Sequence, residues 1–226
     1  MNRLQTRVGT LVLKNPVICG SGEHTMDGEH IRAALASGAG AVVAKSTNES
    51  MAAKQQLDKT DYALFDASWN RLPWGGRVPA DATLFCRSGL VQRSFDGWVD
   101  ELAKLDLEAA AQDSYVIASL ILADLDRCVD HVRALDAAGL RVIEINIGAP
   151  HGEEAARGAI ALERNEARVE AIITRVRAAT RLPLWVKLTG QSENVVALAA
   201  AARRAGAWQA GRRRRGAAHE QGPRDL

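Results

Sequence analysis

Short apolar runs alternate with amphipathic segments along most of the chain. Apolar positions at helical spacing predict helices over residues 27–38, 95–111, 125–138, 163–180 and 192–205. The apolar runs predict strands over residues 10–13, 16–19, 40–44, 115–121, 141–147 and 183–188, with 4–8 and 10–13 as a hairpin. The pattern weakens over residues 49–81, which predicts a long loop of the kind that often acts as a lid.

Strands that alternate with helices favour a parallel α/β sheet. Each predicted strand also has polar or glycine residues at its C-terminal end, as in a (β/α) TIM-type barrel, whose sites lie on that face. A doubly wound sheet is the alternative, and it would carry a glycine-rich phosphate turn after its first strand. Gly20-Ser21-Gly22 is too short for that turn. We therefore expect an incomplete barrel, with about five of the eight strand–helix units.

Composition narrows the class of protein. A chain of 226 residues with 47% hydrophobic and 25% charged residues is long enough for one soluble globular domain. Cys19, Cys86 and Cys128 are widely spaced, so we expect reduced thiols and no metal site. The N-terminus has no signal segment and no apolar run approaches a membrane span, which predicts a cytoplasmic protein.

Candidate chemistry is richest in residues 141–152, where a buried strand ends at Asn146 and opens into a Pro-His-Gly loop. An amide at the C-terminal end of a barrel strand can hydrogen-bond a ligand as both donor and acceptor. The alternative is that Asn146 only satisfies the backbone of its own loop and that His151 orders that loop. Trp69 and Trp74 would form either a lid or a surface cover.

Four segments, in order, resemble the flavin-containing barrel of dihydropyrimidine dehydrogenases and, more broadly, the dihydroorotate dehydrogenase family. The Pro-His-Gly sequence favours the dihydropyrimidine branch. The matching segments are residues 14–22, 38–46, 143–152 and 182–189.

The resemblance implies an FMN-dependent oxidoreductase that transfers hydride between a pyrimidine-like ring and the flavin. Lys45 and Lys187 would lie near the flavin pyrimidine edge, where positive charge stabilises the anionic reduced ring. Asn146 would bind the substrate or the flavin. The partners implied are the pyrimidine-like substrate and either a second copy of the chain or an electron-transfer subunit, because no iron–sulfur cysteine cluster is present. The implied cofactor-binding residues are Ser21, Gly22, Lys45, Ser46, Asn146 and Lys187.

One departure from the family affects catalysis. The family's base, a Cys or Ser just before the loop proline, is here Ala149. Loss of such a base costs about 10²–10⁴-fold in rate. Either His151 or a residue of 49–81 replaces it, or the reaction differs, or there is none. The rival hypothesis is therefore a catalytically silent flavin- or small-molecule-binding fragment or a subunit scaffold.

A second departure is at the C-terminal end. Residues 1–207 read as a partial barrel and 208–226 as a basic tail with five arginines, which predicts a truncated or frame-shifted reading of a longer gene. A basic tail can bind nucleic acid, but we rank that function last because the charge is confined to the tail. Barrels often bind phosphate on the loops after strands 7 and 8, so we do not expect this chain to hold FMN tightly.

Overall fold

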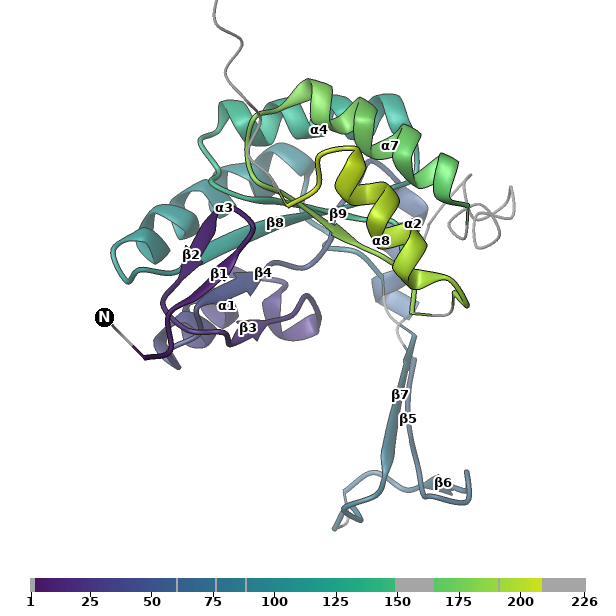
Figure 1. Ribbon diagram of the computed structural model, residues 1–226. Coiled ribbons are helices and arrows are strands. Elements are labelled where there is room, and N and C mark those ends of the chain that lie inside the picture. Colours follow the sequence, from purple (N-terminus) through teal and green to yellow (C-terminus); the bar gives the residue numbers. More distant parts are fainter. Residues whose placement is uncertain are drawn as a thin grey trace, which may run out of the picture.

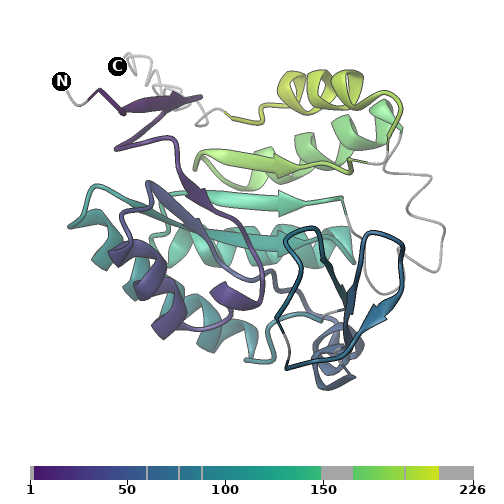
Figure 2. The ribbon, with the colours of Figure 1, turned by 90° about the horizontal axis from the view of Figure 1, so that it is seen from below.

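The computed structural model describes residues 3–59, 61–75, 77–87, 89–148, 165–190 and 192–208. Its centre is a parallel five-stranded sheet in which spatial order follows chain order. The sheet curls into half of a barrel (Figures 1 and 2), which confirms the predicted incomplete (β/α) TIM-type fold. The strands are β3 (Ile18–Cys19), β4 (Ala41–Val43), β8 (Tyr115–Ile121), β9 (Ile143–Asn146) and β10 (Leu184–Lys187).

Helices connect successive strands and cover the convex face of this sheet (Figure 1). Four of them begin at a side chain that accepts a hydrogen bond from a backbone N–H of the first turn, namely Asp27, Ser94, Asp124 and Asn165. The last helix begins at Val195, later than the predicted start at residue 192, and its N-cap residue Asn194 makes no side-chain capping hydrogen bond. The helices are α1 (Gly28–Ala36), α3 (Phe95–Ala110), α4 (Leu125–Ala137), α7 (Glu166–Ala179) and α8 (Val195–Arg204).

Strand alternation divides the buried residues between the two faces of the sheet. Val42, Val116 and Ile145 belong to the large core between the sheet and the helices. The concave face has a smaller core, in which the hairpin of β1 (Thr6–Val8) and β2 (Leu11–Leu13) packs on β4, β8 and Val142, the residue before β9. The predicted N-terminal hairpin is thus confirmed, and it covers the N-terminal part of the concave face.

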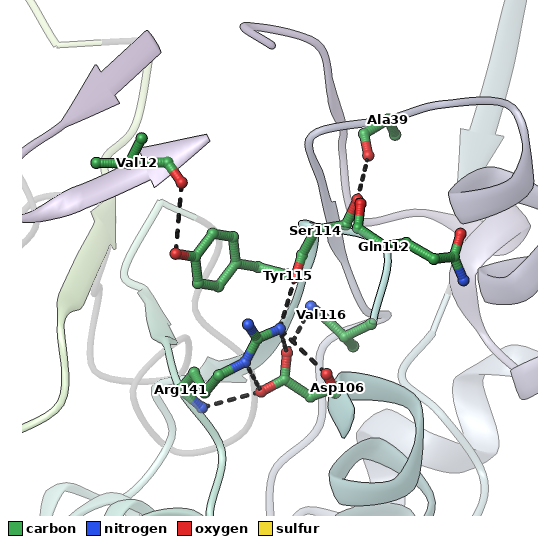
Figure 3. A network of polar contacts seen from close by, with 8 residues as sticks. All are labelled: Val12, Ala39, Asp106, Gln112, Ser114, Tyr115, Val116 and Arg141. Atoms are coloured by element: carbon green, nitrogen blue, oxygen red, sulfur yellow. Dashed lines mark hydrogen bonds and ion pairs between the residues drawn. The ribbon is translucent and has the colours of Figure 1, made fainter. Parts of the chain in front are cut away.

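A polar network fixes the N-terminal ends of β8 and β9 (Figure 3). Asp106 of α3 accepts hydrogen bonds from the backbone N–H of Val116 (2.9 Å) and from the backbone and guanidinium of Arg141 (2.6–3.1 Å). The Arg141 guanidinium lies 4.4 Å from the ring centroid of Tyr115, whose hydroxyl donates to the Val12 carbonyl. Because barrel sites lie at the opposite end of the strands, this network serves stability.

The predicted long loop is wrong for most of residues 49–81. The chain there forms α2 (Met51–Gln55), the 3-10 helix η2 (Gln56–Lys59) and an antiparallel sheet with strand order β6–β5–β7. The strands of this antiparallel sheet are short, and the third of them, β7, lies after residues 49–81, where the apolar pattern of the sequence weakens. Figure 1 shows this sheet as an arm that projects from the parallel sheet, and Trp69 and Trp74 are exposed on it. The strands are β5 (Asp61–Phe65), β6 (Arg71–Leu72) and β7 (Thr83–Arg87).

Candidate functional site

Polar side chains form a row across the concave face, beyond the apolar part that the hairpin covers. The strand register pairs Ser119 with Glu144 and Asn146 with Lys187. Alternate residues of a strand share a face, so Glu144 and Asn146 lie on the same side of β9. Ser119 Oγ donates to Glu144 Oε1 at 2.8 Å, and Ser46 Oγ lies 2.8 Å from Ser119 Oγ. The row therefore connects the end of β4 to the end of β10.

Glu144 is a buried carboxyl within this row. Burial raises its pKa, while the hydrogen bond from Ser119 and the positive charge of Lys187 act in the opposite direction. Burial disfavours the charged form because the interior solvates it less well than water does. Glu144 and Lys187 thus influence each other electrostatically, although the sequence alone did not single out Glu144. A charged residue inside an apolar strand was the available signal.

The end of β4 departs from regular strand pairing. Val43 is opposite Ile117, whereas Thr47 is opposite Leu120, so four steps on this strand match three on β8. One extra residue lies between these pairs, as in a β-bulge, a feature that is frequent next to active sites. Residues 44–46, which contain the predicted cofactor-binding Lys45 and Ser46, lie in this irregular stretch.

Lys45 extends along the C-terminal rim of the sheet to the 3-10 helix η1 (Glu23–Thr25), which follows β3. Its Nζ lies 3.1 Å from Glu23 Oε1, and its backbone N–H donates to the Thr25 carbonyl at 2.8 Å. Only 8% of Lys45 is exposed. The ammonium is thus held at the rim by a carboxylate that the sequence interpretation missed, because nothing in the local pattern marks Glu23.

The turn after β3 carries the other two residues expected to contact a cofactor. The backbone N–H of Gly22 donates to Thr25 Oγ1 at 3.1 Å, so this donor is engaged within its own turn. A Cβ atom on Gly22 would lie 2.7 Å from the His24 ring, so a larger residue at this position would require that ring to move. Ser21 is half-buried next to it. Contact of Ser21 and Gly22 with a flavin remains a prediction.

The Asn146 residue is buried, with only 3% of its surface exposed. Its Oδ1 accepts a hydrogen bond from the backbone N–H of Gly148 at 3.1 Å, so the side chain does support its own loop. Its register partner on β10 is Lys187. The amide therefore lies beside the lysine at the C-terminal rim, in an orientation that the loop fixes, and a role for its Nδ2 donor toward a ligand stays a prediction.

Several predicted features fall outside the described residues. These are Ala149, His151 and the basic residues after position 208. Within the described segments, no group of three or more His, Cys, Asp and Glu residues could hold a metal ion. None of the helices described is both long and apolar enough to cross a membrane.

No protein-family model matches the chain. Among solved structures, a putative dihydrodipicolinate synthetase from Pseudomonas aeruginosa is 12% identical at a TM-score of 0.46, over 84% of this chain and 52% of that one. The carboxyl transferase domain of Rhizobium etli pyruvate carboxylase with pyruvate is 18% identical at a TM-score of 0.39, over 52% of this chain and 20% of that one.

Curated proteins give a more specific similarity. The catalytic subunit of dihydroorotate dehydrogenase B (NAD(+)) from Methanosarcina mazei is 29% identical over 198 residues, and that from Methanosarcina acetivorans is 30% identical over the same length. Both alignments cover 87% of this chain and 56% of the relative, so the chain spans about half the length of these relatives. The subunit from Petrotoga mobilis is 31% identical over 120 residues, which is 53% of this chain and 38% of that one. These similarities of 29–31% identity to catalytic subunits of dihydroorotate dehydrogenase B support a dihydroorotate dehydrogenase-like family.

Proposed function

We propose that the chain carries part of the site of an FMN-dependent oxidoreductase of the dihydroorotate/dihydropyrimidine dehydrogenase type. The reaction would be hydride transfer between a pyrimidine-like ring and the flavin. The observation that carries this proposal is the polar row that ends at Asn146 and Lys187, at the C-terminal end of the concave face. Barrel enzymes place their chemistry at this end of the strands.

The donors at this rim fit the chemistry of a flavin. Lys45 and Lys187 supply two ammonium groups, and Asn146 supplies an amide. The pyrimidine part of a flavin offers carbonyl oxygens and ring nitrogens that accept such hydrogen bonds, and when bound FMN supplies a two-electron acceptor for hydride. Positive charge at its edge favours the anionic reduced form. The lysines would thus bind the ring and bias its redox state.

Two neighbouring groups would keep this donor set in place. The Gly148 N–H holds Asn146 Oδ1, which directs the amide and leaves Nδ2 as the donor for a ring carbonyl. Ser119 holds the Glu144 carboxyl beside Lys187. Preorganised donors of this kind cost little reorganisation when charge develops on the ligand.

We also propose a partner subunit. The curated relatives are named catalytic subunits of an NAD(+)-dependent enzyme. A separate chain would then accept electrons from the reduced flavin of this one. Association with a second copy of this chain is the alternative partner.

The test is a titration of the chain with FMN, followed by flavin fluorescence. We expect saturable binding that Lys187→Met weakens by about tenfold or more, because a charge-assisted hydrogen bond contributes roughly 1.5–3 kcal/mol. The matched control is Lys104→Met, which removes an exposed lysine from α3 on the convex face and leaves binding unchanged. Binding that is absent, or that is equal in both variants, contradicts the proposal.

A catalytically silent flavin-binding barrel is the second candidate function. Replacement of the family's usual base by Ala149 favours it. Anaerobic addition of dihydroorotate or a dihydropyrimidine separates the two candidates. Bleaching of the flavin absorbance supports the oxidoreductase, and bound flavin that stays oxidised supports the silent barrel.

A further inference from the structure

The projecting arm joins the barrel at a compact root. The root consists of residues 49–59, through which the chain enters the arm, and residues 89–93, through which it returns to α3. The backbone N–H of Leu90 donates to the Ala53 carbonyl at 3.0 Å, so the two segments are in direct contact. The arm that Figure 1 shows projecting from the sheet is therefore held at one place, and loosening of the root frees it.

A buried lysine lies inside this root. Lys54 of α2 is 6% exposed, and its Nζ donates to the Arg93 carbonyl at 3.0 Å, which ties α2 to the returning segment. Burial lowers the pKa of Lys54, because it disfavours the charged form, while the carboxylate of Glu49 acts in the opposite direction. A second positive charge next to this ammonium group is therefore costly.

His131 of α4 closes the root from the barrel side. Its ring stacks on the ring of Phe95 at the start of α3, with the centroids 3.9 Å apart and the planes 24° from parallel. Its Nδ1 lies 3.8 Å from Glu49 Oε2, and only 14% of the His131 side chain is exposed. Glu49 Oε1 accepts a hydrogen bond from the backbone N–H of Asp124, the N-cap of α4, at 3.1 Å. Glu49 thus connects the start of the arm to α4, and one of its two partners is a side chain that can change charge near neutral pH.

The charged groups around His131 act in both directions on its protonation. Burial, the largest effect, lowers the pKa of His131 below its usual value of about 6.5. Lys54 of α2 and Arg127 of α4 lower it as well, whereas Glu49 and Asp130 raise it. The contribution of α3 is an uncharged aromatic ring. The closed root therefore favours the neutral imidazole.

We propose that His131 is an acid-sensitive latch that holds the root of the arm against the barrel. The root is closed while the ring is neutral. When the ring takes up a proton from solvent, a second cation shares the poorly solvated space with Lys54, and the root opens. The arm also reaches the C-terminal rim of the sheet, where Cys86 Sγ lies 3.9 Å from Glu23 Oε1. Opening of the root therefore releases the arm from the rim, whichever ligand binds there.

The direction of the pKa shift fixes the pH range in which the latch acts. In the open root the His131 ring is solvated and has the ordinary histidine pKa of about 6.5. The closed root is therefore fully stable above this pH, and it loses stability as the pH falls from this value to the lowered pKa, because the open form binds the proton more tightly. Each unit by which the pKa is lowered raises the open fraction by up to about tenfold.

Hydrogen–deuterium exchange of the full chain between about pH 8 and pH 5 tests the latch. Each measured rate is divided by the intrinsic rate of the same amide at that pH. We expect the amides of the root, residues 49–59 and 89–93, to lose protection as the pH falls, while the amides of α8 keep theirs. An equal loss of protection in α8 would mean that the whole chain unfolds, and it would overturn a local latch.

Three variants assign the effect to the imidazole. His131→Gln stays neutral over this range, so the protection of the root no longer depends on pH. Glu49→Gln keeps the acceptor for the Asp124 N–H but loses the negative charge, so the pKa of His131 falls further and the opening in acid becomes larger. The matched control is His30→Gln, which removes an exposed histidine paired with Asp27 at the start of α1 and leaves exchange of the root unchanged.

A 1H NMR titration of the His131 ring in the wild-type chain keeps the proposal testable even if His131→Gln does not fold. A pKa below about 6.5 supports the latch, and a pKa at or above that value overturns it. Root protection that does not change with pH in the wild type, or that changes as much in His131→Gln, overturns it as well. These measurements need no FMN, so failure of the latch leaves the proposed function standing, and a chain that binds no FMN leaves the latch standing.

Discussion

Replacement of Asp106 by alanine tests the network at the N-terminal end of the sheet. Only 2% of Asp106 is exposed, and its carboxylate accepts hydrogen bonds from the backbone N–H groups of Val116 and Arg141 as well as from the Arg141 guanidinium. In Asp106→Ala the N–H of fully buried Val116 loses its acceptor, which costs about 1–3 kcal/mol. Removal of one partner of a buried ion pair costs about 3–5 kcal/mol in all.

Because Arg141 is partly exposed, we expect the loss of stability in Asp106→Ala to lie near the lower end of the range for a buried ion pair. The Arg141 side chain is 34% exposed, so water solvates part of the guanidinium once its partner is gone. We expect Asp106→Ala to lower the free energy of unfolding by about 3 kcal/mol, a large share of the roughly 5–15 kcal/mol of an ordinary domain. Urea unfolding followed by circular dichroism measures the difference.

The matched control is Asp130→Ala, which breaks a pair with Arg133 on the surface of α4. Both side chains of that pair are about 60% exposed, at 59% and 62%, and such pairs contribute under about 1 kcal/mol. A loss of under about 1 kcal/mol in Asp106→Ala, similar to the control, would refute the assignment of stability to this network.

Three further predictions concern the rim and the thiols. Burial raises the pKa of Glu144 in the folded protein, so ionisation of this carboxyl costs folding free energy. The wild-type protein therefore loses stability as the pH rises from the ordinary glutamate pKa of about 4.3 to the raised value. Glu144→Gln removes this loss. Equal pH dependence of thermal unfolding in both proteins would contradict this. Gly148→Ala places a Cβ 2.8 Å from the Leu188 carbonyl oxygen, so we expect a loss of about 1–3 kcal/mol in urea unfolding, and a neutral effect would show that the loop can move away. Cys128, whose pKa is raised to about 12, should resist iodoacetamide in the folded chain and react only after unfolding, and rapid labelling of native protein would disagree with its burial.

The sequence was sufficient to predict the parallel half-barrel. Runs such as residues 115–121 are apolar on both faces, as in strands covered on both sides, and caps such as Asp124 mark where helices begin. It was not sufficient for the arm, because β5 and β7 are each five residues long and are stabilised by pairing across eighteen or more positions. Local periodicity carries no information on such a pairing.

The same limit applies to the candidate site. The position of Lys187 next to Asn146 could be predicted because each ends a strand and parallel strands bring their ends together, whereas their role toward a ligand stays a prediction. The ion pair of Lys45 with Glu23 depends on the extra residue after β4 and on the turn after β3, which only the three-dimensional arrangement reveals. Asn146 also supports its own loop, a local role that the sequence could not separate from ligand binding.

We propose that a flavin ring binds at the C-terminal rim of the concave face, and a 1H–15N NMR titration of the labelled chain with FMN follows this binding residue by residue. We expect saturable shifts of the backbone amides at residues 45–46, 146–148 and 187–189, with the helices of the convex face unchanged. Shifts confined to the convex helices, or no saturable shift at any FMN concentration, would contradict it.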